Sequence, residues 1–163
     1  MMKLEPPCNA NNYYEAHIAL LLQSYQALLN KPLLNQLSEL SLGLQVFEAG
    51  FALLSHNADP DPLFTYGNRR ALDLFEFSWS EFIGMPSRFS AEPMQREERE
   101  LLLAKVAAFG FIDDYSGVRI AKSGKRFLIQ QAVVWNVYDA QQNFCGQAAC
   151  FSNASIYSPN AAN

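Results

Sequence analysis

The segment KRFLIQQAVVWNVY, residues 125–138, restricts the fold more than any other part of the sequence. Its β-branched and aromatic residues predict a long strand, yet apolar side chains occupy both alternating sets of positions. Phe127, Ile129, Gln131, Val133 and Trp135 form one set, and Leu128, Gln130, Ala132, Val134 and Asn136 form the other. A sheet with one face in water would alternate between apolar and polar residues. We therefore expect this strand to be covered on both faces.

The neighbouring segments extend the same sheet. Residues 111–122 predict a strand that reaches the long strand through a tight turn at Ser123-Gly124. Residues 144–152 predict a third strand after a turn at 139–143, and this strand is also largely apolar on both faces. An antiparallel meander with a covering layer on each side is expected at the C-terminus.

Helical signals dominate the first two thirds of the chain. Apolar residues recur at helical spacing from residue 13 to Asn30-Lys31-Pro32, which ends the first helix. A second helical segment places Leu33, Leu37, Leu40 and Leu44 on one face and fades at Ala49-Gly50. Further predicted elements are strands at 51–57 and 63–67, a short helix after Asn68, another opened by Ser78 or Ser80, and a longer helix at 93–109 followed by Gly110.

These elements predict an α+β domain with a five-stranded antiparallel sheet. Helices cover one face, and the two N-terminal helices pack on the other face or at a dimer interface. The expected organisation is a flexible tail at 1–12, a helical hairpin at 13–50, a core at 51–153 and a flexible tail at 154–163.

Composition and charge narrow the possible classes of function. The 163 residues suffice for one domain, and the 50% hydrophobic content is typical of a folded protein. A net charge of −4 argues against nucleic-acid partners, because binding phosphates needs a basic surface. Cys8, Cys145 and Cys150 form no CxxC pair, and no apolar run predicts a signal peptide or a membrane span. We expect a reduced, cytoplasmic protein without nucleic-acid or membrane partners, in which Cys145 and Cys150 are small buried hydrophobic residues.

A basic cluster lies in YSGVRIAKSGKRF, residues 115–127. Arg119, Lys122, Lys125 and Arg126 are four of the 12 basic residues of the chain. Charged side chains commonly solvate a hairpin turn, and alternation with Val118 and Ile120 places Arg119 on the wetter face. A solvated hairpin is therefore favoured, and a site for an acidic partner is the alternative.

Long stretches of the chain resemble the MEKHLA family, a PAS-like module. The resemblance is carried by SHNADPDPLFTYGNRRALDLFE, WSEFIGMPSRFSAEP, YSGVRIAKSGKRF and VVWNVYDAQQNFCGQAACF, and it spans about residues 13–152. It implies a PAS-like fold and a signalling or interaction module that binds a small ligand between sheet and helices or dimerises through its outer sheet face. The homeodomain and zipper that accompany this module in plant transcription factors are not present in the sequence.

The segment GMPSRFSAEP looks like the helix of flavin-binding light-oxygen-voltage (LOV) domains that carries a photoreactive cysteine. Ser87 stands at the position of that cysteine, before Arg88 and Phe89, and a serine cannot form the thiol adduct. Ile129 and Ala91 stand where the family has the Asn and Gln that contact the flavin ring. Flavin is therefore not expected, and neither is haem, because residues 93–109 contain no histidine.

Polar residues on apolar strands are candidates for a ligand cavity. Gln131 and Gln147 interrupt apolar faces, so they would either orient a ligand or satisfy each other and the backbone. Trp135 would stack on a ligand or belong to the core. With Ser87, Arg88 and Phe89, these residues form the predicted cofactor-binding set.

Two clusters of charged residues could form a binding site, but each also has a simpler structural explanation. Arg88, Arg96 and Arg99 would surround an anion, although pairing with the neighbouring Glu97, Glu98 and Glu100 is the commoner outcome. His56, Asp59 and Asp61 lie in a turn, which explains the aspartates better than a metal does, and we assign no metal ligands.

Three functional hypotheses follow. The first is a non-catalytic PAS-like sensory or regulatory module that binds a small molecule or a protein partner. The second is a ligand-free interaction module that forms homodimers. The third is a small α+β enzyme, for which only His56 with Asp59 or Asp61 offers acid–base chemistry.

Overall fold

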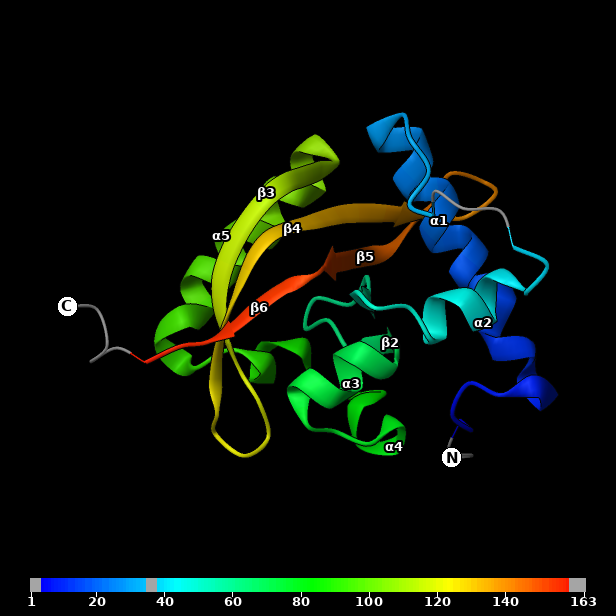
Figure 1. Cartoon of the computed structure of the whole chain (residues 1–163). Coiled ribbons are helices and arrows are strands. Elements are labelled where there is room, and N and C mark those ends of the chain that lie inside the picture. The colour runs from blue at the N-terminus through cyan, green and yellow to red at the C-terminus, as the bar shows by residue number, and fades with distance from the viewer. Residues whose placement is uncertain (1–3, 35–37, 159–163) are drawn as a thin grey trace.

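A six-stranded antiparallel sheet forms the centre of the molecule (Figure 1). The structure is a computed structural model that describes residues 4–34 and 38–158. The strand order is β2-β1-β5-β4-β3, and β6 pairs with the part of β4 that β5 does not reach. The strands are β1 (Ala52–Asn57), β2 (Phe64–Gly67), β3 (Phe111–Ile120), β4 (Arg126–Tyr138), β5 (Phe144–Phe151) and β6 (Asn153–Ile156).

Most helices, with α2 as the exception, begin and end close to the positions that the sequence predicts. They are η1 (Asn9–Tyr14), α1 (Glu15–Leu29), α2 (Leu42–Phe47), α3 (Arg69–Phe75), α4 (Trp79–Phe82), η2 (Ser87–Ser90) and α5 (Pro93–Phe109). The side chain of Asn68 caps α3, as predicted, and of the two candidates for the start of α4, Ser78 and Ser80, it is Ser78 that caps the helix. Gly110 follows α5 with a φ of +102°, a conformation that glycine adopts readily. Within the described part of the chain, no helix is long and apolar enough to cross a membrane.

A bulge in β4 changes which side chains face the interior. Gln131 has a φ of +55°, and the pairing with β3 shifts beside it. Phe127 and Ile129 consequently share a core cluster with Ala132, whereas Trp135 points to the opposite face. The predicted grouping of Phe127, Ile129, Gln131, Val133 and Trp135 on one face is therefore wrong beyond residue 130. A bulged residue breaks the two-residue alternation of a strand.

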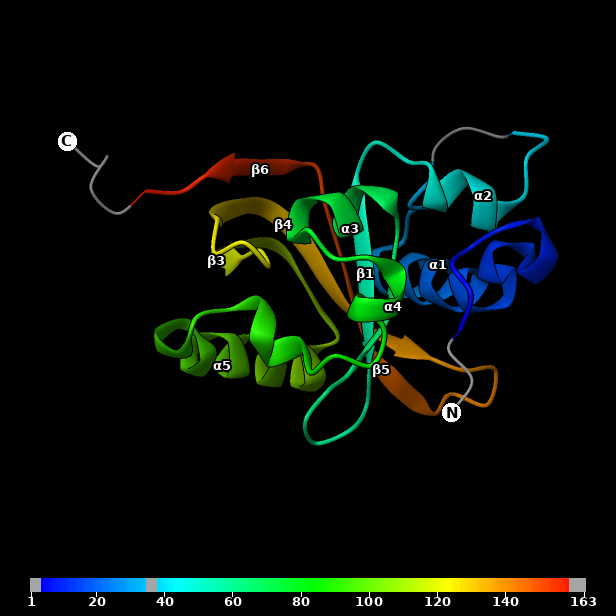
Figure 2. The same ribbon diagram turned by 90° about the horizontal axis from the view of Figure 1, so that it is seen from below.

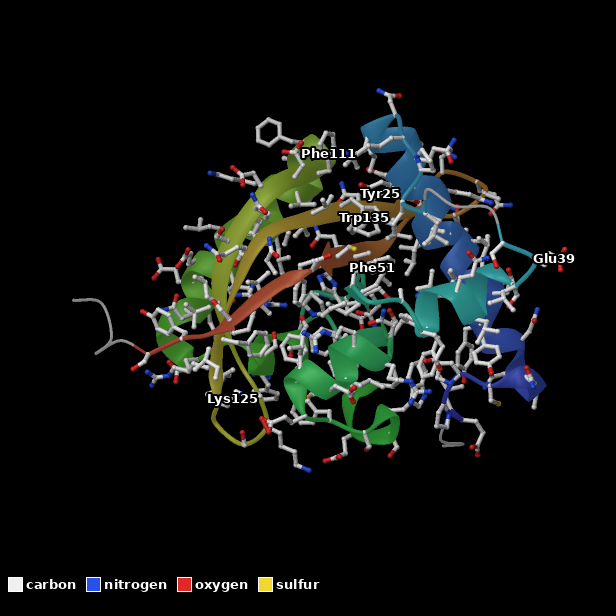
Figure 3. All side chains as sticks on the ribbon, viewed as in Figure 1. Tyr25, Glu39, Phe51, Phe111, Lys125 and Trp135 are labelled. Atoms are coloured by element: carbon white, nitrogen blue, oxygen red, sulfur yellow. The ribbon has the colours of Figure 1, made fainter. Side chains whose placement is uncertain are left out.

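Both faces of the sheet are covered, as expected. We call the face that packs against α1 the outer face, and the face toward α3, α4 and α5 the inner face (Figure 2). On the outer face Trp135 meets the ring of Tyr25 edge-on at 5.0 Å and donates a hydrogen bond to the carbonyl oxygen of Leu21 (Figure 3). On the inner face Leu102 and Val106 of α5 pack against Val134.

Two predicted segments differ from the structure. The second helix, expected from Leu33 to Ala49, is only α2, because Ser41 accepts a hydrogen bond from the backbone N–H of Leu44 and starts the helix there. Leu40 is exposed outside any helix, and Leu37 of the predicted apolar face lies outside the described residues. The C-terminal tail expected from residue 154 begins later, because residues 153–156 form β6 against β4.

Candidate functional site

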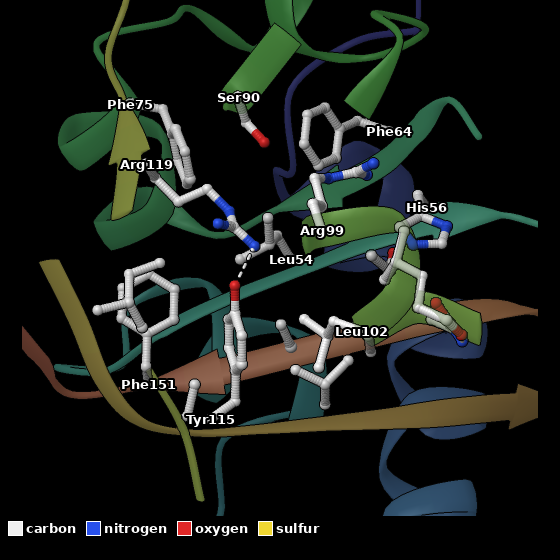
Figure 4. A pocket seen from close by; sticks show the side chains of 18 residues that line it. Leu54, His56, Phe64, Phe75, Ser90, Arg99, Leu102, Tyr115, Arg119 and Phe151 are labelled. Atoms are coloured by element: carbon white, nitrogen blue, oxygen red, sulfur yellow. Dashed lines mark hydrogen bonds between the residues drawn. The ribbon is translucent and has the colours of Figure 1, made fainter. Parts of the chain in front are cut away.

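A cavity of about 70 Å³ lies between the inner face of the sheet and the helices that cover it (Figure 4). Apolar side chains from six elements form most of its wall, namely Leu54, Phe64, Phe75, Leu102, Val134 and Phe151. Polar side chains complete it, among them His56, Ser90, Arg99, Tyr115, Arg119 and Gln147. An apolar wall with a few polar groups is the usual composition of a small-molecule site.

Arg99 of α5 is a buried positive charge in this wall. Its exposed fraction is 5%, and it forms no salt bridge with any carboxylate in residues 4–34 and 38–158. Its guanidinium donates a hydrogen bond to the hydroxyl of Ser87. Burial, followed by the positive charge of Arg119, lowers the pKa of Arg99 to about 10, so the group stays charged at neutral pH. Pairing with the glutamates of α5, the commoner outcome for such a helix, does not occur at Arg99.

Arg119 of β3 is the second guanidinium in the wall. It donates to the hydroxyl of Tyr115 at 2.9 Å and to the carbonyl oxygen of Val118 at 2.9 Å. Tyr115 lies along the strand toward Arg119 because Gly117 stands between them. A Cβ atom at Gly117 would lie 2.2 Å from the hydroxyl of Tyr115. Arg119, expected on the wetter face of its strand, is half-buried, and its side chain borders the cavity.

His56 of β1 presents an unpaired nitrogen. Its Nδ1 atom is 2.9 Å from the carbonyl oxygen of Asn57, which can only accept, so Nδ1 carries the proton. Its Nε2 atom is buried and has no partner among the described residues. Burial lowers the pKa of His56, and the hydrogen bond with Asn57 opposes this only in part. Gln147 lies near the ring, but its two amide N–H groups are donated to Leu103 and Asn136, so Nε2 receives no hydrogen bond from it. The ring is therefore neutral, with a free acceptor at a cavity wall.

Gln147 of β5 lines the cavity, as predicted, but its amide nitrogen is engaged within the protein. It donates to the carbonyl oxygen of Leu103 at 3.0 Å and to Oδ1 of Asn136 at 3.2 Å. Asn136 in turn donates to the carbonyl oxygen of Ala107 at 3.3 Å. This amide pair ties β4 and β5 to α5, so Gln147 positions the helix that carries Arg99.

Gln131 and Trp135 lie away from the cavity. Gln131 is exposed at the bulge, where its side-chain oxygen accepts a hydrogen bond from Asn153 at 2.9 Å, so the prediction that it faces a cavity is wrong. Trp135 is fully buried on the outer face beneath α1, which agrees with the alternative that it belongs to the core.

The residues of η2 divide between the core and the surface. Ser87 is fully buried beside Arg99, and Ser90 reaches the cavity wall. Arg88 pairs with Asp61 at 3.2 Å, and its guanidinium lies 4.4 Å from the ring centre of Phe89, which is 45% exposed. Arg88 and Phe89 therefore lie outside the cavity, because only every third residue of a 3₁₀ turn points inward.

The remaining charged groups find partners or solvent. Lys122 pairs with Glu81, and the Nε atom of Arg126 lies 2.7 Å from Glu92. The solvated-hairpin interpretation thus holds for the turn itself. Asp61 binds Arg88 and Asp59 is exposed, so neither joins His56, and residues 4–34 and 38–158 contain no cluster of three metal-ligating side chains.

The three cysteines are free thiols. Cys150 is buried on the outer face, as predicted, and burial raises the pKa of its thiol to about 12. Cys145 is exposed, which contradicts its predicted burial, because it belongs to the exposed run of residues 140–145 at the turn between β4 and β5.

Sequence reasoning did not single out Tyr115 and considered Arg119 only as part of a basic hairpin, not of the cavity. The pattern Tyr115-x-Gly117-x-Arg119 was the available signal, since it places an aromatic ring and a cation on one strand face with space between them.

Comparison with known proteins decides the family. The model of the MEKHLA domain matches residues 15–156, from the start of α1 to the end of β6. The chain belongs to the MEKHLA domain family. No curated protein matches it at a significant level.

Solved structures show that this MEKHLA domain has a PAS-like fold. A PAS domain from Colwellia psychrerythraea gives a TM-score of 0.57 at 14% identity, over 70% of this chain and 92% of that chain. A LOV domain studied with a flavin analogue gives a TM-score of 0.51 at 20% identity, over 68% of this chain and 80% of that chain. An RNA-binding LOV receptor gives a TM-score of 0.56 at 16% identity, over 72% of this chain and 35% of that chain. At these identities the likeness concerns the fold alone.

The residues of the MEKHLA cavity do not fit a flavin. A volume of about 70 Å³ is well below the roughly 300–1,000 Å³ of pockets for larger ligands. Ile129 offers the ring no hydrogen bond, and the hydroxyl of Ser87 is bound by Arg99. The absence of flavin stays a prediction.

Proposed function

We propose that this MEKHLA domain is a non-catalytic sensory module that binds a small molecule in the cavity between its sheet and α5. The unpaired Nε2 atom of His56 carries the proposal. A buried acceptor without a hydrogen bond costs roughly 1–3 kcal/mol, and a ligand donor at the cavity would offset that cost. The PAS-like fold supports this proposal, because a LOV domain of similar fold was studied with a flavin analogue.

Arg99 and Arg119 strengthen the same interpretation. Both side chains border the cavity from different elements, and neither pairs with a carboxylate of the described chain. Charged groups of this kind are normally neutralised within a core or held for an external partner.

A cavity-filling variant tests the proposal. The full chain would be screened against a library of small metabolites by thermal unfolding, with native mass spectrometry to detect bound molecules. Ala149→Leu places a larger side chain in the cavity wall, and Ala108→Leu makes the same change on the exposed side of α5.

We expect at least one compound to raise the melting temperature of the wild type and of Ala108→Leu but not of Ala149→Leu. A response that survives in Ala149→Leu would show that ligands bind elsewhere. A library without any hit, together with only the bare protein mass, would refute ligand sensing.

The structure does not favour the alternative of a ligand-free dimerisation module. That hypothesis rested on the apolar outer face, and α1 of the same chain already covers Trp135, Val137 and Cys150 there. Homodimerisation stays a prediction that light scattering on the full chain would test.

A further inference from the structure

We propose that the ligand is a short-chain monocarboxylate, with its carboxylate held by Arg99 and Arg119 and its chain against the apolar wall. This inference rests on the proposed function and specifies the chemistry of the same cavity. Figure 4 shows the two arginine side chains entering the space from α5 and β3.

The distribution of charge supports this inference. Three more exposed arginines each have a carboxylate partner: Arg69 binds Glu48, Arg88 binds Asp61 and Arg126 binds Glu92. The two arginines of the cavity wall have none among the residues that the structure describes. Arg70 and Arg96 have none there either, but Arg70 is exposed to water and Arg96 lies over the half-exposed ring of Phe89. An uncompensated charge is costly in an apolar environment, so the missing anion is expected to come from outside the chain.

The two arginines also have free hydrogen-bond donors. A guanidinium group has five N–H groups in a planar fork. Arg99 donates one hydrogen bond to a described residue, and Arg119 donates two. The remaining donors suit the two oxygens of a carboxylate, which arginine binds in a bidentate manner.

The size and polarity of the remaining space limit the ligand further. One water needs a cavity of roughly 10–15 Å³, so a space of about 70 Å³ holds at least about five waters. This corresponds to a ligand of about five to seven non-hydrogen atoms. The wall around it is formed by side chains such as Leu102, Val134 and Phe151, which favour a hydrocarbon chain over a sugar or a second charged group.

Calorimetric titration of the full chain tests this with butyrate, its neutral amide butyramide and inorganic phosphate as probes. We expect butyrate to bind, butyramide to bind at least tenfold more weakly, and phosphate not to displace butyrate. Arg99→Gln and Arg119→Gln should each weaken butyrate binding at least tenfold. The matched control Arg88→Gln removes a surface arginine paired with Asp61 and should leave the affinity within twofold.

Folding of each variant is checked by circular dichroism. If Arg99→Gln does not fold, Arg119→Gln and Arg99→Lys still decide the question, because the lysine keeps the charge and loses the planar fork. We expect Arg99→Lys to bind butyrate more weakly than the wild type.

Several outcomes would overturn the inference without touching the proposed function. If butyramide and butyrate bind with equal affinity, and Ala149→Leu abolishes binding of both, the cavity binds neutral ligands as well as charged ones. Displacement of butyrate by phosphate would show a general oxyanion site. Unchanged butyrate affinity in both glutamine variants, or no butyrate binding at all, would also refute the inference that the ligand is a carboxylate. The metabolite screen would then decide separately whether the cavity binds any small molecule.

Discussion

Replacing Asn68 with alanine should destabilise this protein more than the loss of an ordinary helix cap. The side chain of Asn68 is fully buried and makes four hydrogen bonds. Its oxygen accepts from the backbone N–H groups of Leu53 and Ala71, and its nitrogen donates to the carbonyl oxygens of Val46 and Phe51. One residue thus joins the end of α2, the start of β1 and the start of α3.

The magnitude follows from these partners. Losing the cap of α3 costs about 1 kcal/mol. Losing the other three bonds removes the Asn68 partner of the N–H of Leu53 and of the carbonyl group of Phe51, at roughly 1–3 kcal/mol each before relaxation and water entry. The carbonyl oxygen of Val46 loses one donor but still accepts from the N–H of Ala49. Because such losses are not additive, we expect Asn68→Ala to lower the free energy of unfolding by about 3–5 kcal/mol.

Urea denaturation followed by tryptophan fluorescence measures this effect, since Trp79 and Trp135 are both buried. The matched control is Ser78→Ala, which removes the cap of α4 at an exposed site and should cost about 1 kcal/mol. If Asn68→Ala costs no more than Ser78→Ala, the argument that this side chain links three elements is wrong.

Three further predictions concern protonation, backbone conformation and the outer face. Burial lowers the pKa of His17 and His56, so the unfolded chain binds more protons than the folded chain below about pH 6.5. The free energy of unfolding should therefore fall as the pH drops from 7 to 5, by at most about 1.4 kcal/mol per pH unit for each histidine. In the double variant His17→Gln/His56→Gln, the free energy of unfolding should depend less steeply on pH. Gly146→Ala should lower stability by at least about 2 kcal/mol in urea denaturation, because φ is +141° and a Cβ atom would lie 2.0 Å from the carbonyl oxygen of His56; an unchanged midpoint would contradict this. Trp135→Phe, which loses the hydrogen bond to Leu21 and some buried volume, should cost about 1–3 kcal/mol in the same assay, and a neutral result would show that α1 packs loosely.

The order of the elements could be predicted from the sequence because local signals marked their ends. Asn68 and Ser78 cap helices through their own side chains, and Ser123-Gly124 turns the chain between β3 and β4. Two-sided apolarity also correctly predicted a sheet covered on both faces. These features depend on neighbouring residues, which a single sequence displays directly.

The cavity could not be predicted, because it depends on one bulge and on contacts across the fold. Nothing in Gln130-Gln131 indicates which glutamine takes the left-handed conformation, yet that choice turns Ala132 and Val134 inward. The sequence shows Arg99 among glutamates, but only the tertiary structure shows that its side chain points away from them to Ser87.

The position of α1 has a consequence for any attempt to shorten this protein. α1 is not an appendage, because its Ile18, Leu21 and Tyr25 belong to the same hydrophobic cluster as Leu53 and Trp135 of the sheet. A fragment that begins at the first strand would present that apolar surface to water and should aggregate, so the smallest unit that folds includes the N-terminal helix.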